Sequence, residues 1–217
     1  ERMVLPAGTL SLMNPEEPHT GHAAAGHVRY NMLYVTEEAV RDLLAPVRLR
    51  GFAEIAPPDR GLLLRRALTS LARRLNAAPH PDWRLAAEEA VHEVLALAFT
   101  HYGRADLRPA GHEPVTVARL REEIAAGVDE GRDLTLGGLA ASAGLSPSYF
   151  IRSIARETGM TPHAHVLRCR VTRARSLLLQ GVPAAEAALA AGFCDQAHMI
   201  RQFRRQLGVT PGSLVRH

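Results

Sequence analysis

The chain contains two similar stretches, LAASAGLSPSYFIRSIARETGMTP at residues 139–162 and AALAAGFCDQAHMIRQFRRQLGVTP at residues 187–211. Gly144 in the first copy matches Gly192 in the second, and both copies end on Thr-Pro. The copies start 48 residues apart, and the second is one residue longer between its glycines. A repeat of this kind predicts two copies of one supersecondary unit.

Each copy is typical of a helix, a tight turn and a second helix. In the first copy, Gly144 suits the sharp turn because glycine accepts a positive φ at little cost. Ser146 and Pro147 are typical of the N-cap and first position of the helix that follows. Phe150 and Ile154, four residues apart, then face inward. An earlier Thr135 caps the preceding helix, which runs through Ala143 in this interpretation.

The second copy follows the same plan, with Met199 and Phe203 as its inward residues. Cys194 is expected at the N-cap position, and Asp195 in the first turn, where its charge suits the helix dipole. The outward faces of the two second helices are then as follows: Ser148, Ile151, Arg152 and Arg156 in the first copy, and Gln196, Ala197, Ile200, Arg201, Arg204 and Arg205 in the second. This is the helix-turn-helix design, in which the second helix enters a DNA major groove.

A long helix is predicted between the copies, from the Thr161-Pro162 cap to about Gln180. Its buried stripe consists of Leu167, Val171, Ala174 and Leu178. Its other faces carry Arg168, Arg170, Arg173 and Arg175. Eighteen residues give a rod of about 27 Å, which could hold two reading helices near the ~34 Å spacing of successive major-groove faces.

The first half of the chain predicts short strands followed by helices. The candidate strands are Met3–Leu5, Thr9–Met13 and Arg29–Val35. Helical patterns begin after Thr36, a predicted N-cap, and continue over residues 60–76, where Leu64, Leu68, Leu71 and Leu75 form one stripe, and over residues 83–102. Residues 103–115 contain Gly, Pro and charge with few apolar side chains, which indicates an interdomain linker.

Charge is unevenly divided between the halves. Residues 1–115 hold 13 Arg against 14 acidic residues, whereas residues 116–217 hold 13 Arg against 8 acidic residues, and the chain has no Lys. A basic half indicates a polyanionic partner, nucleic acid first. The two cysteines, Cys169 and Cys194, form no CxxC motif, which favours a reducing cytoplasm. No apolar run suggests a membrane helix.

The candidates for metal chemistry are weak. His19, His22 and His27 form one short cluster in a polar loop, and Cys169, Cys194 and His198 lack zinc-ligand spacing. No phosphate loop, nucleophile elbow or HExxH motif is present. We therefore expect no metal, no cofactor and no catalytic residue, and interpret the chain as not an enzyme.

Residues 116–217 closely resemble the DNA-binding domain of AraC-type (AraC/XylS family) transcriptional regulators. The resemblance rests on the two unequal copies, on RCRVTRARSLLLQG at residues 168–181, and on AAGFCDQAHMIRQFRRQLGVTP at residues 190–211. It implies base-reading positions at Ser148, Ile151, Arg152, Gln196, Ala197, Ile200 and Arg201, and phosphate contacts at Ser146, Arg156, Arg204 and Arg205. Ile151 and Ile200 depart from the family pattern, which commonly has polar residues there.

LSLMNPEEPHTGH and VRYNMLYV, within residues 10–35, resemble the distal part of the cupin-like effector domain of these regulators. The expected fold is mainly α: an all-α C-terminal domain of two helix-turn-helix motifs joined by a long linker helix, preceded by a partial β (cupin-like) segment and helices. The expected domains are a partial cupin-like effector-binding segment (1–50), a helical dimerisation segment (51–102), a linker (103–115) and the DNA-binding domain (116–217).

The resemblance implies a sequence-specific transcription regulator that reads two adjacent major grooves per monomer and responds to a small-molecule effector, whose binding residues the sequence does not indicate. Double-stranded promoter or operator DNA is the expected partner, with a homodimer and RNA polymerase as further expectations. Two alternatives remain open at this point: a cupin-type metal-dependent enzyme and a non-specific architectural DNA-binding protein.

Overall fold

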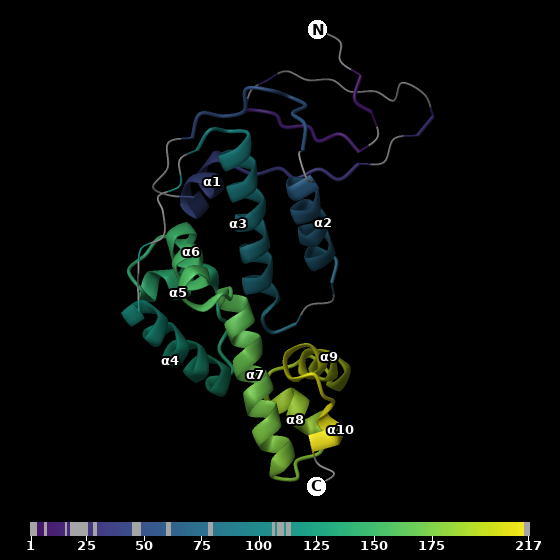
Figure 1. The fold of residues 1–217 in the computed structure, drawn as a ribbon, viewed down its shortest axis with the longest axis vertical. Helices are drawn as coiled ribbons and strands as arrows, with labels where there is room; N and C mark the ends of the chain where they lie inside the picture. Colours follow the sequence, from purple (N-terminus) through teal and green to yellow (C-terminus); the bar gives the residue numbers. More distant parts are fainter. Residues whose placement is uncertain are drawn as a thin grey trace.

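The computed structural model describes residues 4–6, 8–15, 17, 26–27, 30–44, 49–59, 62–77, 80–105, 107, 111 and 114–214, and its regular secondary structure there is helical (Figure 1). The helices in that part are α1 (Glu37–Leu44), α2 (Leu63–Leu75), α3 (Trp83–His101), α4 (Pro114–Glu130), α5 (Leu136–Ser142), α6 (Pro147–Thr158), α7 (Pro162–Leu179), α8 (Ala184–Ala190), α9 (Gln196–Leu207) and α10 (Pro211–Leu214). Among these residues, no helix is both long and apolar enough to cross a membrane.

The predicted strands are not found among the described residues. Thr9–Met13 has no regular secondary structure, and the described parts of the other two candidates, 4–5 and 30–35, are also irregular. Met3 and Arg29 lie outside the described residues. The Leu12 amide donates to the carbonyl of Ile55 at 2.8 Å. A single bond of this kind does not make a strand, because a strand needs a partner that continues the hydrogen-bond ladder.

The first three helices form the N-terminal helical unit. Thr36 caps α1 as predicted, since its hydroxyl accepts from the amide of Ala39 at 3.1 Å. In α2, Leu64 and Leu71 are buried against α3, whereas Leu75, the last residue of the predicted stripe, is 45% exposed. The stripe is therefore a core contact over most of its length.

Helix α3 belongs to two cores at once. Along one part it packs against α1 and α2. Leu85, near its N-terminus, is fully buried in a different cluster, with apolar residues of α4 to α7. The core of the second half therefore includes a residue that precedes the predicted linker, and α4 itself begins inside that linker, at Pro114.

Helix α7 joins the two repeat units, and Figure 1 shows it as a long rod with α5 and α6 near its start and α8, α9 and α10 along its far part. Its predicted stripe is buried: Leu167, Val171, Ala174 and Leu178 pack with α8 and α9. Phe150 and Ile154 fill the first unit, and Met199 and Phe203 fill the second, all four fully buried. The predicted scaffold of both units is confirmed.

Candidate nucleic-acid interface

The second helix-turn-helix unit is formed by α8, the turn after it, and α9. Gly192 has a φ of +84°, which the turn requires. Residues with a Cβ atom adopt this backbone conformation only at an energetic cost. Asp195 is the N-cap residue of α9, and its carboxylate accepts from the His198 amide at 2.5 Å. The expectation that Cys194 fills this position is wrong, because the cap belongs to the next residue, whose carboxylate is the stronger acceptor.

The outer face of α9 is open to solvent. Gln196 and Ala197 in its first turn are exposed, Ile200 is half-buried, and Arg201 is exposed. Arg204 and Arg205, in the last turn, are also exposed. Every predicted contact residue of the second unit therefore lies at or partly at the surface, and polar and cationic groups dominate that surface.

The first unit, α5 and α6, has the same local construction. Thr135 caps α5, with its hydroxyl accepting from the Gly138 amide at 3.1 Å. Gly144 has φ of +68° in the turn, and the hydroxyl of Ser146 accepts from the Tyr149 amide at the start of α6. Thr135, Gly144 and Ser146 all occupy the positions that the sequence predicts for them.

The outer face of α6, however, is not open. Ser148 is fully buried, and Arg152 donates a hydrogen bond to its hydroxyl. Ile151 packs against the core together with Leu43 of α1. The prediction that Ser148 lies on the outer face is wrong in this structure, because its side chain has no exposed surface in the folded chain. Helix α1 packs against α6, and Arg156, one turn after Arg152, is exposed.

Helix α3 also faces α6. His92 is 4% exposed, and burial, with the positive charge of Arg152, lowers the pKa of its imidazole to about 4. Burial likewise lowers the pKa of the Arg152 guanidinium. The Tyr149 hydroxyl accepts from the Gly111 amide at 2.8 Å. Besides its core contact with α4, the first unit is therefore in contact with α1, α3 and the segment at Gly111, all of which precede it.

The arginines of α7 have different surroundings. Arg168 and Arg175 are exposed, and Arg173 donates to Asp129 at 2.8 Å and to the Val128 carbonyl at 2.9 Å. Arg170 is only 5% exposed, so the prediction that it covers an outer face is wrong. It pairs with Asp82, which precedes α3, and this contact between distant segments has no local sequence signal.

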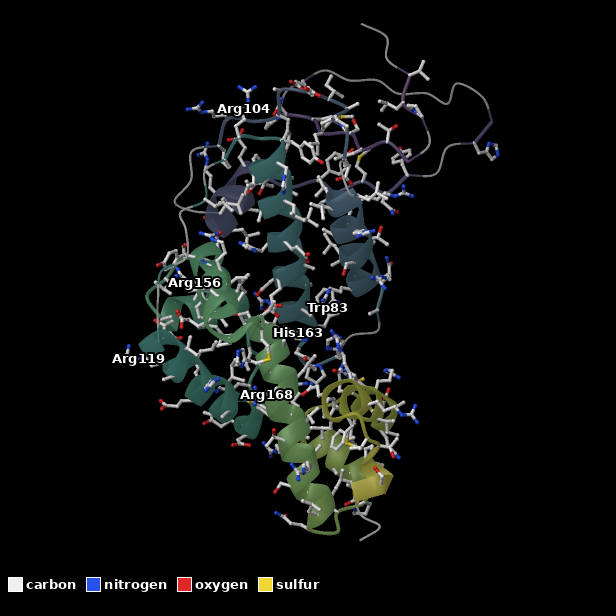
Figure 2. The ribbon with its side chains drawn as sticks, in the orientation of Figure 1. Trp83, Arg104, Arg119, Arg156, His163 and Arg168 are labelled. Atoms are coloured by element: carbon white, nitrogen blue, oxygen red, sulfur yellow. The ribbon has the colours of Figure 1, made fainter. Side chains whose placement is uncertain are left out.

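The N-termini of α3 and α7 meet, and Figure 2 shows Trp83 and His163 close together there. Carboxylates of α3 accept from backbone amides of the second half: Glu88 from Leu136 at 2.6 Å, and Glu89 from His163 at 2.5 Å. Anionic side chains at the first turns of α5 and α7 stabilise those helices through the exposed amides and the helix dipole. Burial raises the pKa of Glu89. Sequence reasoning missed these residues, which read as ordinary charges of an amphipathic helix.

Metal-binding side chains do not gather in the described part of the chain, where no group of three could hold an ion. His19 and His22 lie outside the described residues. Cys169 and Cys194 are free, and the Cys194 sulfur is 3.4 Å from His198 Nδ1.

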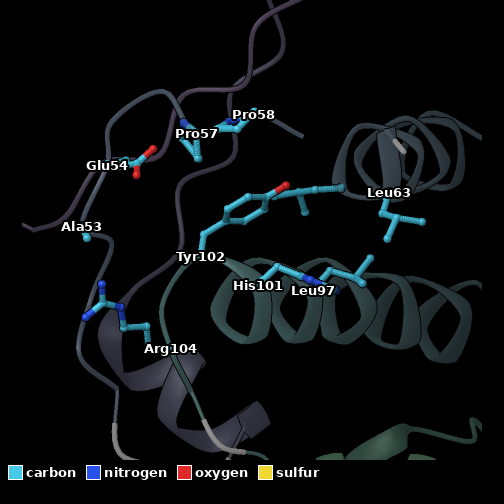
Figure 3. A pocket seen from close by; sticks show the side chains of 10 residues that line it. Ala53, Glu54, Pro57, Pro58, Leu63, Leu97, His101, Tyr102 and Arg104 are labelled. Atoms are coloured by element: carbon cyan, nitrogen blue, oxygen red, sulfur yellow. The ribbon is translucent and has the colours of Figure 1, made fainter. Parts of the chain in front are cut away.

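A pocket of about 480 Å³ lies at the C-terminal end of α3. Figure 3 shows Leu63 and Leu97 on one side of it, Glu54 and Arg104 on the other, and Tyr102 between them. The Tyr102 hydroxyl donates to Asp59 at 3.1 Å. Apolar walls with a few charged groups can hold a small molecule that has an apolar body and a polar end.

Two family models match the chain. A helix-turn-helix domain model matches residues 139–217, and an AraC-like ligand binding domain model matches residues 1–95. The two matches do not overlap, and together they leave the segment around α4 outside either model.

The proteins to which this chain is similar are described as transcriptional regulators. An uncharacterized HTH-type transcriptional regulator, YbfI of Bacillus subtilis (strain 168), is 27% identical over 207 residues, which are 92% of this chain and 72% of that protein. The HTH-type transcriptional regulator MtrA of Neisseria gonorrhoeae is 34% identical over 76 residues, 34% of this chain and 25% of that protein. A probable AraC family transcriptional regulator from Rhodopseudomonas palustris CGA009 is 29% identical, with a TM-score of 0.43, over 46% of this chain and 94% of that one.

Proposed function

Because the chain belongs to the AraC-type transcriptional regulators and is a DNA-binding regulator with a ligand-binding domain, we propose that it reads promoter DNA with α9 and α6 in two adjacent major grooves. The observation that carries the proposal is the open face of α9, on which Gln196, Ala197 and Arg201 are exposed beside each other in the first turns. The match to a helix-turn-helix domain model and the similarity to transcriptional regulators favour this function over an enzyme or an architectural DNA-binding protein.

The side chains of α9 suit base edges. A glutamine amide pairs with adenine and an arginine fork pairs with guanine, each discriminating by roughly 1–3 kcal/mol. Gln196 and Arg201 are our candidates for those two contacts, and Ile200 and Ala197 for apolar contact with thymine methyl groups. Arg204 and Arg205, further along the helix, suit phosphates, which position a protein without reading sequence.

The first unit would use Ser148, Ile151 and Arg152 for bases, and Ser146 and Arg156 for phosphates. In the described arrangement, Ser148 is buried and α1 packs against α6. We therefore propose that α9 makes the first specific contacts and that α6 joins after α1 has moved away from it. Helix α7 sets the spacing: its 18 residues span about 27 Å, close to the ~34 Å between successive major-groove faces.

The remaining parts of the proposal concern partners. A small-molecule effector binds the N-terminal half and changes the contacts between that half and α6. A homodimer reads paired sites, as many helix-turn-helix regulators do, and contacts RNA polymerase at the promoter. The site of action is the cytoplasm, where bacterial-type promoters are found.

Footprinting with DNA selected from a random pool by the full chain tests the proposal. Arg201→Ala should relax specificity at one base position, and Arg205→Ala should weaken binding to all sequences and reduce the salt slope by about one. Arg66→Ala, which removes the same charge from an exposed position on α2, is the matched control. If neither Arg201→Ala nor Arg205→Ala changes binding relative to this control, the assignment of α9 as the reading helix is wrong.

A further inference from the structure

Asp82 is the most enclosed carboxylate among the described residues. Its side chain is 1% exposed and has three cationic or imidazole partners: His80 Nδ1 at 2.6 Å, His163 Nε2 at 2.9 Å and Arg170 Nη1 at 3.3 Å. Although it occupies the N-cap position of α3, it makes no capping hydrogen bond. Its side chain is therefore directed entirely toward residues outside α3, two of them in α7.

Burial alone would raise the pKa of Asp82, but the hydrogen bonds with His163 and His80 and the charge of Arg170 outweigh it and hold the pKa far below its usual range. Asp82 is therefore an anion in the folded chain. A buried charge is tolerated only when it is paired and hydrogen-bonded. Removal of the anion would leave Arg170 buried without a counter-charge.

Arg170 connects this anion to the turn of the second unit. Besides pairing with Asp82, its guanidinium donates to the carbonyl oxygen of Gly192. The contact is close, since a Cβ placed on Gly192 would lie 3.2 Å from the guanidinium carbon. Gly192 directs the chain from α8 into α9, so one guanidinium joins the N-terminal end of α3 to the residue that orients the reading helix.

A second contact reaches α9 itself. His198, in the first turn of α9, is buried, and its ring centroid lies 5.7 Å from that of His80 and 5.3 Å from that of Phe193. His80 thus touches both Asp82 and α9. We name His80, Asp82, His163 and Arg170 the Asp82 cluster; it contacts the second unit at the turn and at the first helical turn of α9.

We propose that Asp82 is a positioning residue for DNA reading: it fixes Arg170 against Gly192 and thereby holds α9 in its reading orientation relative to α3. The inference rests on the proposed function of α9, but Asp82 itself touches no DNA. It places a determinant of DNA affinity within the 1–95 segment that matches the ligand-binding model. A change in the position of α3 would then be transmitted to α9 through two side chains.

The test is a double-mutant cycle in the full chain, with binding measured on the duplex that the unmodified protein selects. Asp82→Asn should lower specific affinity about tenfold or more. In an Arg170→Met background, where Asp82 has no guanidinium left to position, the same Asp82→Asn change should have no further effect on affinity. Asp129→Asn is the matched control, because Asp129 also pairs with an arginine of α7, Arg173, but its side chain is 69% exposed. This change should alter affinity less than twofold.

A spectroscopic readout separates positioning from general loss of stability. Cys194 is an exposed free thiol in the turn, so a nitroxide attached there in a Cys169→Ala background reports directly on turn motion. Well below the melting temperature, Asp82→Asn should increase nitroxide mobility, whereas Asp129→Asn should leave it unchanged.

Several results would overturn the inference. If Asp82→Asn leaves affinity unchanged while Arg201→Ala relaxes specificity, α9 reads DNA without help from Asp82. If Asp82→Asn still weakens binding in the Arg170→Met background, Asp82 does not act through Arg170. A gain in DNA affinity in Asp82→Asn would mean that the Asp82 cluster opposes the reading orientation of α9 instead of holding α9 in it. If Arg201→Ala also has no effect, the proposed function fails together with the inference.

Discussion

The two helix-turn-helix units have the same scaffold and opposite surroundings. In both, a glycine turn and two buried residues of the second helix fix the geometry: Phe150 and Ile154 in α6, and Met199 and Phe203 in α9. The face of α9 is open, whereas the face of α6 is packed against α1 and approached by α3. A repeat therefore specifies how a unit folds, but the rest of the chain decides whether its outer face is free.

The units also differ in how they are tied to the N-terminal half. Helix α6 is held by apolar contact with α1 and by burial of His92 beside Arg152. The second unit is held by the Asp82 cluster, which is polar and limited to the turn and the start of α9. Ser148, Ile151 and Arg152 of α6 are buried or half-buried, whereas the polar contact at the turn leaves the face of α9 exposed.

The largest expected effect concerns His92 and tests how α6 is covered. Its pKa is about 4 in the folded chain against an ordinary 6.5, so the unfolded chain binds more protons between these values. The stability contributed by neutral His92 is thus complete above about pH 6.5 and is lost as pH falls toward 4, by on the order of 3 kcal/mol.

Urea unfolding at several pH values measures this loss, and the comparison of variants isolates it from other acidic and basic groups. His92→Leu should reduce the fall in unfolding free energy between pH 6.5 and 4. His101→Leu, at an exposed position on the same helix, should keep the full fall. Equal slopes in the two variants would mean that α3 does not bury His92 against the first unit.

A smaller effect is expected at the two turn glycines. Both have positive φ, so alanine is strained at either position, by about 1 kcal/mol. At Gly144 a Cβ meets nothing within 4 Å, whereas at Gly192 it meets the Arg170 guanidinium at 3.2 Å. Gly192→Ala should therefore destabilise the chain more than Gly144→Ala, as measured by chemical denaturation, and only Gly192→Ala should weaken binding by α9. Equal losses of stability and of DNA binding in both variants would mean that the Arg170 contact does not distinguish the turn at Gly192 from the turn at Gly144.

The smallest expected effect concerns the packing of α1 against α6. Leu43→Ala trims an α1 side chain that packs against the same core cluster as Ile151. A half-buried leucine truncation costs on the order of 1 kcal/mol, which corresponds to about a fivefold shift in an equilibrium. Protection of the groove assigned to α6 should then appear at several-fold lower protein concentration in footprinting. Leu63→Ala, at an exposed position on α2, should leave it unchanged; if Leu43→Ala does the same, α1 does not limit access to α6.

Local features of the sequence were sufficient for most of the helices. Thr36, Thr135, Ser146 and Thr161 cap the helices they were expected to cap, because a capping side chain bonds to amides two or three residues away. The long helix between the copies was also predicted, since its stripe repeats at helical spacing.

Contacts between distant segments were not predictable in the same way. Asp82 and Arg170 lie 88 positions apart, and each alone resembles an ordinary helix residue. The burial of Ser148 likewise was not indicated by the helical spacing of α6, which places this residue on the outward face. The strand at Thr9–Met13 was wrongly predicted, because a strand-like sequence pattern forms a strand only when a partner completes the hydrogen-bond ladder. Among the described residues, the segment makes a single backbone hydrogen bond to Ile55.

The position of α3 determines where this chain can be recombined with its relatives. Hybrids that exchange ligand-binding halves are most simply joined in a linker, and residues 103–115 look like one. Such a junction would place a foreign α3 against α5 and α7, because Leu85 completes their core and Glu88 and Glu89 bond to their first amides. A junction between α2 and α3 keeps α3 with the second half, but it places a foreign α2 against α3, where Leu64 and Leu71 pack. In engineering terms, a cassette that ends before Asp82 must keep the apolar face of α2 that fits α3.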